Sequence, residues 1–350
     1  MSGVAAVIEQ VEGAPTLLSL ELLTMARRLA REMGQALEAL AIGPGGAASA
    51  GILSSYGVSF LHVADHERLG AYAPGAWAHT VVQLVQGAHP AVVMGTGSDR
   101  GAEVMAHLGA RLGLPLAANC TEVTISLPLE GGGWGGGAAG EFLVTRQRWG
   151  GSLLEEARLK GEVKLLTVAP HALTAEAEPA RTEVTVEVRR PSLDEKDFRV
   201  TLSPQPNADS GRISLAQARV VVGGGRGVGG AEGFRALEEL AALLGGAVGC
   251  SRAVTSLGWR PHSDQVGQTG TRIAPDLYIA CGISGAIQHM VGCRAAKQIL
   301  AINTDRDAPI VAQADYAVIG DVGTVVGAVT SEIRKRQSRP VPSAPDALSP

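Results

Sequence analysis

The feature that most constrains this sequence is a series of short apolar runs in its last third, each followed directly by small and polar residues. The runs are residues 277–281, 298–302 and 316–319. Runs of this length and composition predict strands that are buried on both faces of a parallel sheet. Ligands collect at the carboxyl ends of such strands, so the residues that follow these runs predict a binding site.

The polar residues at these strand ends indicate what kind of ligand is bound. Residues 282–286 are small, and a helical stretch then runs to Met290. Small residues let a ligand approach the backbone, and the first turn of a helix presents unpaired N–H groups to phosphate. The next two runs deliver Asn303 and Asp321 to the same edge of the sheet, where such hydrogen-bonding groups suit ribose hydroxyls.

Two arginines stand at the ends of the preceding predicted strands, 218–222 and 247–250. Arg226 lies within a glycine run that meets a G-x-G-x-x-G template, which is weak evidence by itself. Arg252 follows the second strand. A guanidinium group can pair with a pyrophosphate through two hydrogen bonds, so the pair predicts an anionic or electron-accepting ligand.

The N-terminal half alternates strands and helices, which predicts a mostly parallel sheet. Its first strands are residues 4–8, 37–42 and 91–94. The loop 95–101 has the Gly, Thr and Ser residues of a phosphate cradle but no Walker-type lysine. We therefore favour a tight turn with a helix cap at Ser98 or Asp99, without excluding a nucleotide.

After Thr121 the sequence no longer alternates strands and helices and instead predicts successive strands. Strands are predicted at residues 122–126 and 141–146, joined by a glycine tract at 131–137 that contains Trp134 and suggests a mobile connection. Residues 162–168 and 183–188 also alternate polar and apolar side chains, so we expect the first domain to close with antiparallel strands on its sheet.

A linker composition at residues 203–211 places the domain boundary. The fold class is therefore α/β with two domains. We expect an N-terminal α/β domain at 1–203, with a mostly parallel sheet plus antiparallel strands, and a C-terminal doubly wound domain at 204–330. Residues 331–350 are expected to be a helix end and a disordered tail, because the last ten are rich in proline and serine.

Composition excludes several classes of protein. The net charge is −4, and Phe, Trp and Tyr occur only four times each, so nothing favours binding to nucleic acid. The sequence has no transmembrane segment and no C-x-x-C pair, and Met1 lies close to the first predicted strand. We therefore expect a cytoplasmic protein without a signal peptide. No catalytic nucleophile, paired carboxylates or metal cluster is recognisable, which argues against bond-making chemistry of its own.

Several strings of the C-terminal half together resemble the signature of the electron transfer flavoprotein α subunit. The most specific are Val-Gly-Gln-Thr-Gly at 266–270 and Ser-Gly-Ala-Ile-Gln-His at 284–289, in that order. The others are residues 224–227, 251–252, 275–279, 282–283 and 301–303. In the N-terminal domain the resemblance is limited to its α/β character and to Thr145 and Arg146.

The resemblance implies one FAD in each α/β heterodimer, held by the C-terminal domain and covered by the β subunit, which the N-terminal domain also contacts. By matching positions, Arg226 would contact the pyrophosphate. Arg252, Thr269 and His289 would surround the isoalloxazine ring, with His289 donating a hydrogen bond as a neutral or cationic ring. The implied FAD-binding residues are Arg226, Ser251, Arg252, Val266, Gly267, Gln268, Thr269, Ser284, Gly285, Ala286, Ile287, Gln288, His289, Asn303, Asp321 and Val322.

The function implied is that of an electron carrier. FAD would accept electrons from an acyl-CoA dehydrogenase or another dehydrogenase, and pass them to a quinone oxidoreductase or another acceptor. Two alternatives stay open. One is an electron-bifurcating member of the same family, with NADH and a second flavin bound largely through the β subunit. The other is a nucleotide-binding module without redox chemistry.

Overall fold

The structure is a computed structural model that describes residues 3–126, 141–179, 183–202, 214–216 and 218–337. The chain divides into two compact units, Met1–Ala208 and Asp209–Pro350. The predicted linker at 203–211, the glycine tract with Trp134 and the tail at 341–350 lie outside the described residues. The two units are described separately below.

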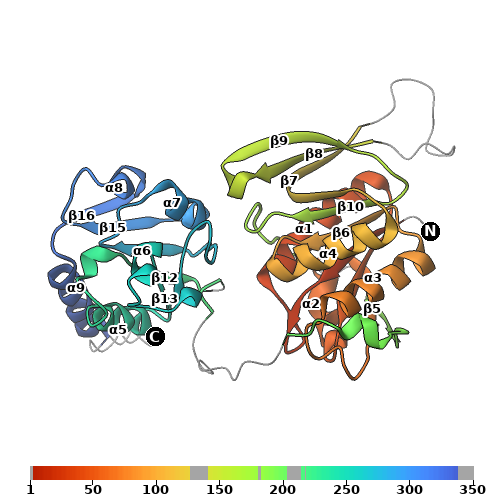
Figure 1. The fold of residues 1–350 in the computed structure, drawn as a ribbon, viewed down its shortest axis with the longest axis horizontal. Coiled ribbons are helices and arrows are strands. Elements are labelled where there is room, and N and C mark those ends of the chain that lie inside the picture. The colour runs from red at the N-terminus through yellow and green to blue at the C-terminus, as the bar shows by residue number, and fades with distance from the viewer. Residues whose placement is uncertain (1–2, 127–140, 180–182, 203–213, 217, 338–350) are drawn as a thin grey trace, which may run out of the picture. The chain divides into compact units, whose positions relative to one another are not determined.

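The N-terminal unit contains one large sheet with the strand order β11-β5-β4-β1-β6-β10-β7-β8-β9 (Figure 1). Its strands are β1 Val4–Ile8, β4 Leu37–Ile42, β5 Val58–Ala64, β6 Val92–Thr96, β7 Leu116–Ser126, β8 Glu141–Arg148, β9 Leu153–Leu159, β10 Lys164–Val168 and β11 Thr185–Arg189. A separate small hairpin pairs β2 Gln10–Val11 with β3 Ala14–Pro15. The helices are α1 Leu17–Met33, α2 Ala50–Ser54, α3 Pro74–Ala88 and α4 Asp99–Leu112.

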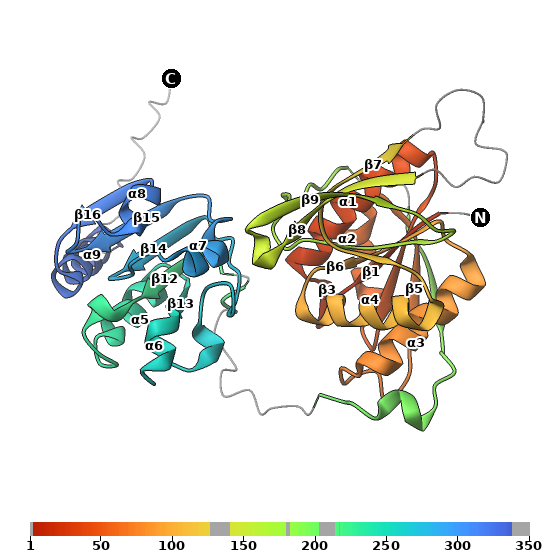
Figure 2. The same ribbon diagram turned by 45° about the horizontal axis from the view of Figure 1, so that its top comes forward.

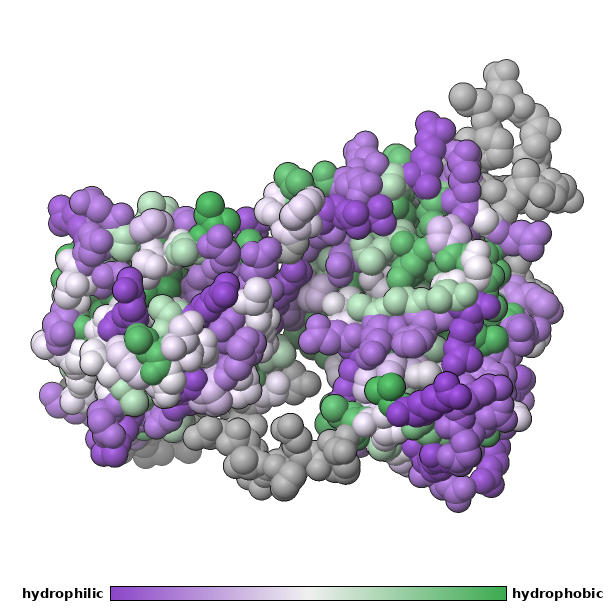
Figure 3. Space-filling model, in the orientation of Figure 1, coloured by the Kyte–Doolittle hydropathy of each residue, from purple (hydrophilic) through white to green (hydrophobic). Residues whose placement is uncertain are grey.

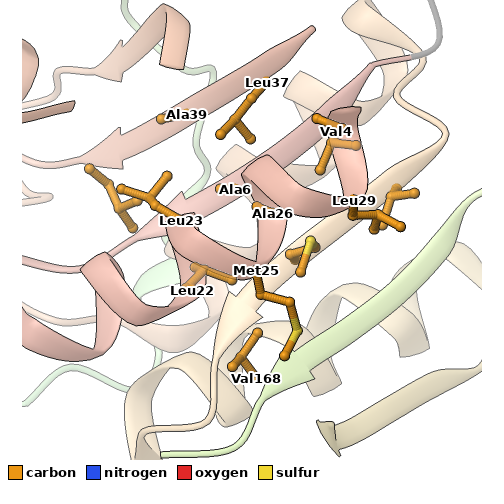
Figure 4. Packing of buried hydrophobic residues seen from close by; sticks show 14 of the residues in the cluster. Val4, Ala6, Leu22, Leu23, Met25, Ala26, Leu29, Leu37, Ala39 and Val168 are labelled. Carbon is orange, nitrogen blue, oxygen red and sulfur yellow. The ribbon is translucent and has the colours of Figure 1, made fainter. Parts of the chain in front are cut away.

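Helices cover both faces of this sheet. The apolar side of α1 packs on β1, β4 and β10, as Figure 4 shows for Leu22, Met25 and Val168. Helices α3 and α4 cover the other face, where Val81 and Leu108 are fully buried. Helix α1 begins after Thr16, whose side chain accepts a hydrogen bond from the Ser19 N–H, as expected of an N-cap.

The expectation that the unit closes with antiparallel strands is wrong for two segments. Strand β10 pairs in parallel with both β6 and β7, and β11 pairs in parallel with β5. Within the described part of this sheet, only the neighbours β7, β8 and β9 are antiparallel, at one edge (Figure 2). Lys164 produced the misleading alternation, because its ammonium group is buried over the Phe142 ring, 5.4 Å from the ring centroid.

The C-terminal unit is a five-stranded sheet in which all neighbours are parallel, in the order β13-β12-β14-β15-β16. The strands are β12 Val220–Gly224, β13 Ala247–Cys250, β14 Leu277–Cys281, β15 Ile299–Asn303 and β16 Tyr316–Ile319. The helices are α5 Phe234–Leu243, α6 Arg252–Ser256, α7 Ile287–Cys293, α8 Pro309–Gln313 and α9 Val322–Gln337. The predicted doubly wound fold is confirmed, since α7 and α8 pack on one face and α5 and α9 on the other (Figure 1).

The order of the strands fixes where a ligand can bind in this unit. From β12 the chain moves outward to β13, and it then returns to place β14 on the other side of β12. The loops that follow β12 and β14 therefore leave the sheet toward opposite faces. A crevice opens between such loops at the carboxyl ends of the strands.

The surface of both units mixes hydrophilic and hydrophobic residues in the view of Figure 3. Scattered apolar side chains of this kind are normal on a folded protein. Among the described helices, none combines the length and the apolar character needed to cross a bilayer.

A pair of leucines on α1 tests the packing of the N-terminal unit. Leu22 is fully buried, whereas Leu17 is 39% exposed. We expect Leu22→Ala to lower the free energy of unfolding by about 2–5 kcal/mol, because it leaves a cavity in the core. The control Leu17→Ala should lower it by only about 0.5 kcal/mol. Urea denaturation measures both, and equal losses would contradict the assigned packing.

Candidate functional site

A cavity of about 520 Å³ opens at the carboxyl ends of the parallel strands in the C-terminal unit. It lies where the strand order reverses between β12 and β14. Its lining comes from the segments that follow β12, β13, β14 and β15. The lining residues are Gly225, Arg226, Gly227, Ser251, Arg252, Ala253, Gln265, Val266, Gly267, Gln268, Thr269, Gly282, Ile283, Ser284, Ala286, Gln288, His289, Asn303, Asp305 and Ala308.

Glycines let the loops after β12 and β14 touch through their backbones. The Gly225 N–H donates to the Cys281 carbonyl at 2.8 Å, and the Gly227 N–H donates to the Gly282 carbonyl at 3.1 Å. A Cβ added at Gly225 would lie 2.2 Å from the Gly282 carbonyl oxygen. The glycine run is thus required for loop packing, which explains it without any dinucleotide motif.

Two arginines give the cavity a positive lining. Arg226 follows β12, and Arg252 begins the short helix α6 after β13. Both side chains are exposed, and neither guanidinium forms an ion pair with a carboxylate in the described part of the chain. Asp305 is the one acidic residue in the lining, so an anionic ligand would find an excess of positive charge.

The segment after α6 holds a threonine hydroxyl at the cavity. The Gln265 side chain is 2% exposed, accepts from the Thr255 hydroxyl at 2.8 Å and donates through Nε2 to the Thr269 hydroxyl at 2.9 Å. Because Thr269 accepts this bond, its own hydroxyl hydrogen is left to donate elsewhere. Sequence reasoning missed Gln265, since nothing in the sequence indicates that this amide is buried.

Asn303 lines the cavity, but its side-chain amide hydrogen-bonds to the protein backbone. Its Nδ2 donates to the Ile283 carbonyl at 2.9 Å, and its Oδ1 accepts from the Asp305 N–H at 3.0 Å. Asn303 therefore ties the loop after β14 to the loop after β15. Ser284 and Gln288 instead present exposed side chains to the same cavity.

Four of the predicted residues do not line the cavity. Asp321 accepts from the Thr324 N–H and hydroxyl, both at 2.9 Å, and so caps α9; the backbone bond from Thr324 lowers the pKa of its carboxyl group. Val322 is buried beside α5, and Ile287 is 72% exposed. Gly285 adopts φ +81° against the backbone of Ile310. Their contact with a ligand stays a prediction.

His289 is buried at the edge of the cavity and is 7% exposed. Its Nε2 lies 2.8 Å from the Tyr278 hydroxyl, while its Nδ1 has no hydrogen-bond partner in the described structure. Burial lowers the pKa of the ring to about 4, and the nearby backbone of Val266 counteracts this only in part. The ring is therefore neutral at physiological pH, which is one of the two forms that the resemblance left open.

The cysteines show no nucleophilic character. Cys120, Cys250, Cys281 and Cys293 are all free and buried. Burial raises the pKa of each thiol to about 12, so each stays protonated. Within the described residues, no group of three or more His, Cys, Asp and Glu side chains is arranged to hold a metal ion.

The loop 95–101 of the N-terminal unit is a capped turn, as favoured from the sequence. The Ser98 hydroxyl accepts from the Gly101 N–H at 2.9 Å and caps α4. The carboxylate of Glu9 accepts from the Thr96 and Ser98 hydroxyls at the same place. The hydroxyl groups of this turn are thus already paired with groups of the protein.

The lowered pKa of His289 predicts how stability depends on pH. An unfolded histidine binds a proton near pH 6.5, but the folded ring resists it down to about pH 4. The free energy of unfolding of the C-terminal unit should therefore fall as the pH drops from about 6.5 toward 4. Urea denaturation at a series of pH values measures this. If the His289→Gln variant loses the same amount of unfolding free energy between about pH 6.5 and 4, His289 is not the cause and the prediction is contradicted.

Comparisons with known proteins agree with this architecture. A family model described as the electron transfer flavoprotein domain matches residues 4–194. A second model, described as the electron transfer flavoprotein FAD-binding domain, matches residues 214–294 and so includes most of the cavity lining.

Several curated proteins resemble the chain over nearly its whole length. Electron transfer flavoprotein subunit alpha of Thermoanaerobacterium thermosaccharolyticum is 33% identical, covering 93% of this chain and 96% of the relative. Protein FixB of Clostridium saccharobutylicum is 34% identical, with 95% and 96% covered. Electron transfer flavoprotein subunit alpha of Mycobacterium leprae is 35% identical, with 96% and 100% covered. The chain therefore belongs to the electron transfer flavoprotein α-subunit family, and its C-terminal unit contains the FAD-binding domain of that family.

Proposed function

We propose that this chain is the FAD-containing subunit of an α/β heterodimeric electron carrier. It accepts electrons from a dehydrogenase, such as an acyl-CoA dehydrogenase, and passes them to a quinone oxidoreductase or another acceptor. The observation that carries the proposal is the cavity where the strand order reverses. It is lined by Arg226 and Arg252, which form no ion pair among the described residues, and by the polar side chains of Thr269, Ser284 and Gln288.

The residues present fit FAD on three separate observations. Arg226 and Arg252 supply positive charge for a diphosphate and an electron-rich ring. The glycine contact holds the loops after β12 and β14 together, so that Arg226 and Ser284 line one cavity. Finally, Nδ1 of His289 is a buried polar atom that has no hydrogen-bond partner among the described residues, and such atoms are costly unless something pairs with them.

FAD, when bound, supplies the reversible uptake and release of electrons. The chain's own residues bind it and set its surroundings. Arg226 and the Ser251 hydroxyl would hold the phosphates, while the Thr269 hydroxyl would provide a donor and Arg252 a positive charge. Donors and charges fixed in advance favour negative charge in the site, which makes electron uptake easier.

The β subunit is the second part of the proposal. Two of the relatives described above are named as alpha subunits, which implies a partner subunit for those proteins. We propose the same heterodimer here, with the N-terminal unit contacting the β subunit. An electron-bifurcating heterodimer and a nucleotide-binding module without redox chemistry are the competing functions that the experiment below separates.

Purification of the chain together with its β subunit tests the function directly. We expect flavin absorption bands that bleach on stepwise reduction and return on oxidation, with one flavin in each heterodimer. Two flavins in each heterodimer would favour the bifurcating function. A colourless complex that takes up no FAD would contradict the carrier, and a bound nucleotide without redox activity would favour the module.

The loop contact predicts which glycine the cofactor depends on. Gly225→Ala should weaken FAD binding about tenfold or more, because its Cβ would collide with the Gly282 carbonyl and displace Arg226. Gly230→Ala is the matched control, since a Cβ there meets nothing within 4 Å. Fluorescence titration of FAD into the stripped heterodimer gives both dissociation constants. Equal constants would show that the loop contact does not shape the site.

A further inference from the structure

The side chain of Tyr278 is fully buried, and its hydroxyl contacts His289, which lines the cavity. Tyr278 lies on β14, where it is 0% exposed, and His289 lies on α7, which packs over the same strand. The Tyr278 hydroxyl and Nε2 of His289 are 2.8 Å apart. Tyr278 does not line the cavity, so its effect on a ligand must pass through His289.

The hydrogen bond between these side chains can be arranged in two ways. A neutral histidine carries one N–H and one acceptor nitrogen. Either the phenol donates to Nε2, which leaves the proton on Nδ1, or Nε2–H donates to the phenol oxygen, which leaves Nδ1 as an acceptor. The two tautomers present opposite chemistry at Nδ1.

The surroundings of Tyr278 favour the first arrangement. In the described structure His289 is the only hydrogen-bond partner of the Tyr278 hydroxyl. If the hydroxyl accepted from Nε2, its own hydrogen would be buried without an acceptor, which costs about 1–3 kcal/mol. No room exists for another partner on the Gly223 side, because a Cβ there would lie 2.4 Å from the hydroxyl oxygen. Burial also raises the pKa of the phenol well above 10, so the donor proton stays in place.

We propose that Tyr278 is a positioning residue that holds His289 in the tautomer with its proton on Nδ1. The phenol donates to Nε2, and Nδ1–H is left as a donor that makes no hydrogen bond within the described residues. This inference rests on the proposed function, in which the acceptor for Nδ1–H belongs to FAD. Tyr278 thereby makes His289 a hydrogen-bond donor to an electron-rich acceptor, although Tyr278 itself does not contact that acceptor.

Loss of the Tyr278 hydroxyl should change the tautomer of His289 more than it changes the binding of FAD. Without the Tyr278 donor, Nε2 becomes free to carry the proton, and Nδ1 then presents a lone pair toward the acceptor. A lone pair opposes negative charge on a neighbouring acceptor, whereas an N–H stabilises it. Tyr278→Phe should therefore retain FAD but shift its reduction potential to a more negative value.

Nitrogen NMR of the heterodimer labelled with ¹⁵N-histidine reads the tautomer directly. We expect wild-type His289 to show a protonated Nδ1 and a bare Nε2, and Tyr278→Phe to show a mixture or the opposite tautomer. Tyr316→Phe is the matched control, because Tyr316 is 60% exposed on β16 and should leave both the tautomer and the potential unchanged.

The outcomes separate this inference from the proposed function. A protonated Nε2 in the wild-type protein overturns the role of Tyr278, and this result does not depend on whether the Tyr278→Phe variant folds. An unchanged tautomer in a folded Tyr278→Phe variant overturns it as well. A heterodimer with the expected tautomer that binds no FAD would instead contradict the proposed function, while the Tyr278 assignment would stand.

Discussion

The candidate site depends on one backbone contact, between the loop after β12 and the loop after β14. The N–H groups of Gly225 and Gly227 donate to carbonyls of the opposing loop, and the Gly282 backbone lies against them. Gly225, Gly227 and Gly282 line the cavity at the point where the strand order reverses. The same contact holds Arg226 near the segment before α7, so that both line one cavity. Any side chain at these glycines would separate the two loops.

The cavity divides its polar groups into two kinds. Arg226 and Arg252 are exposed and form no ion pair among the described residues, so they can meet an anionic ligand at little desolvation cost. His289 is buried and neutral, and it is held from behind by Tyr278. The charged groups would therefore attract an anionic ligand, whereas the buried neutral histidine would orient it. Such a division suits a ligand with an anionic end and a ring that gains electrons.

Much of this arrangement could be predicted from the sequence, because strands buried in a parallel sheet appear as apolar runs and their ends collect at one edge. Twelve of the sixteen proposed site residues line the cavity, although their contact with FAD stays a prediction. Gln265 could not be predicted, since only the fold buries its amide. Lys164 misled the prediction of β10, because a buried lysine has the same sequence pattern as an exposed one. The neutral state of His289 likewise depends on burial.

Hydrogen–deuterium exchange of the heterodimer with and without FAD tests the central claim most directly, because it reports where the flavin is held. Binding at the cavity predicts slower exchange in peptides that cover residues 225–227, 251–253 and 265–269, all of which contribute to the lining. Unchanged exchange in these peptides, with protection confined to residues 95–101 of the N-terminal unit, would contradict the account.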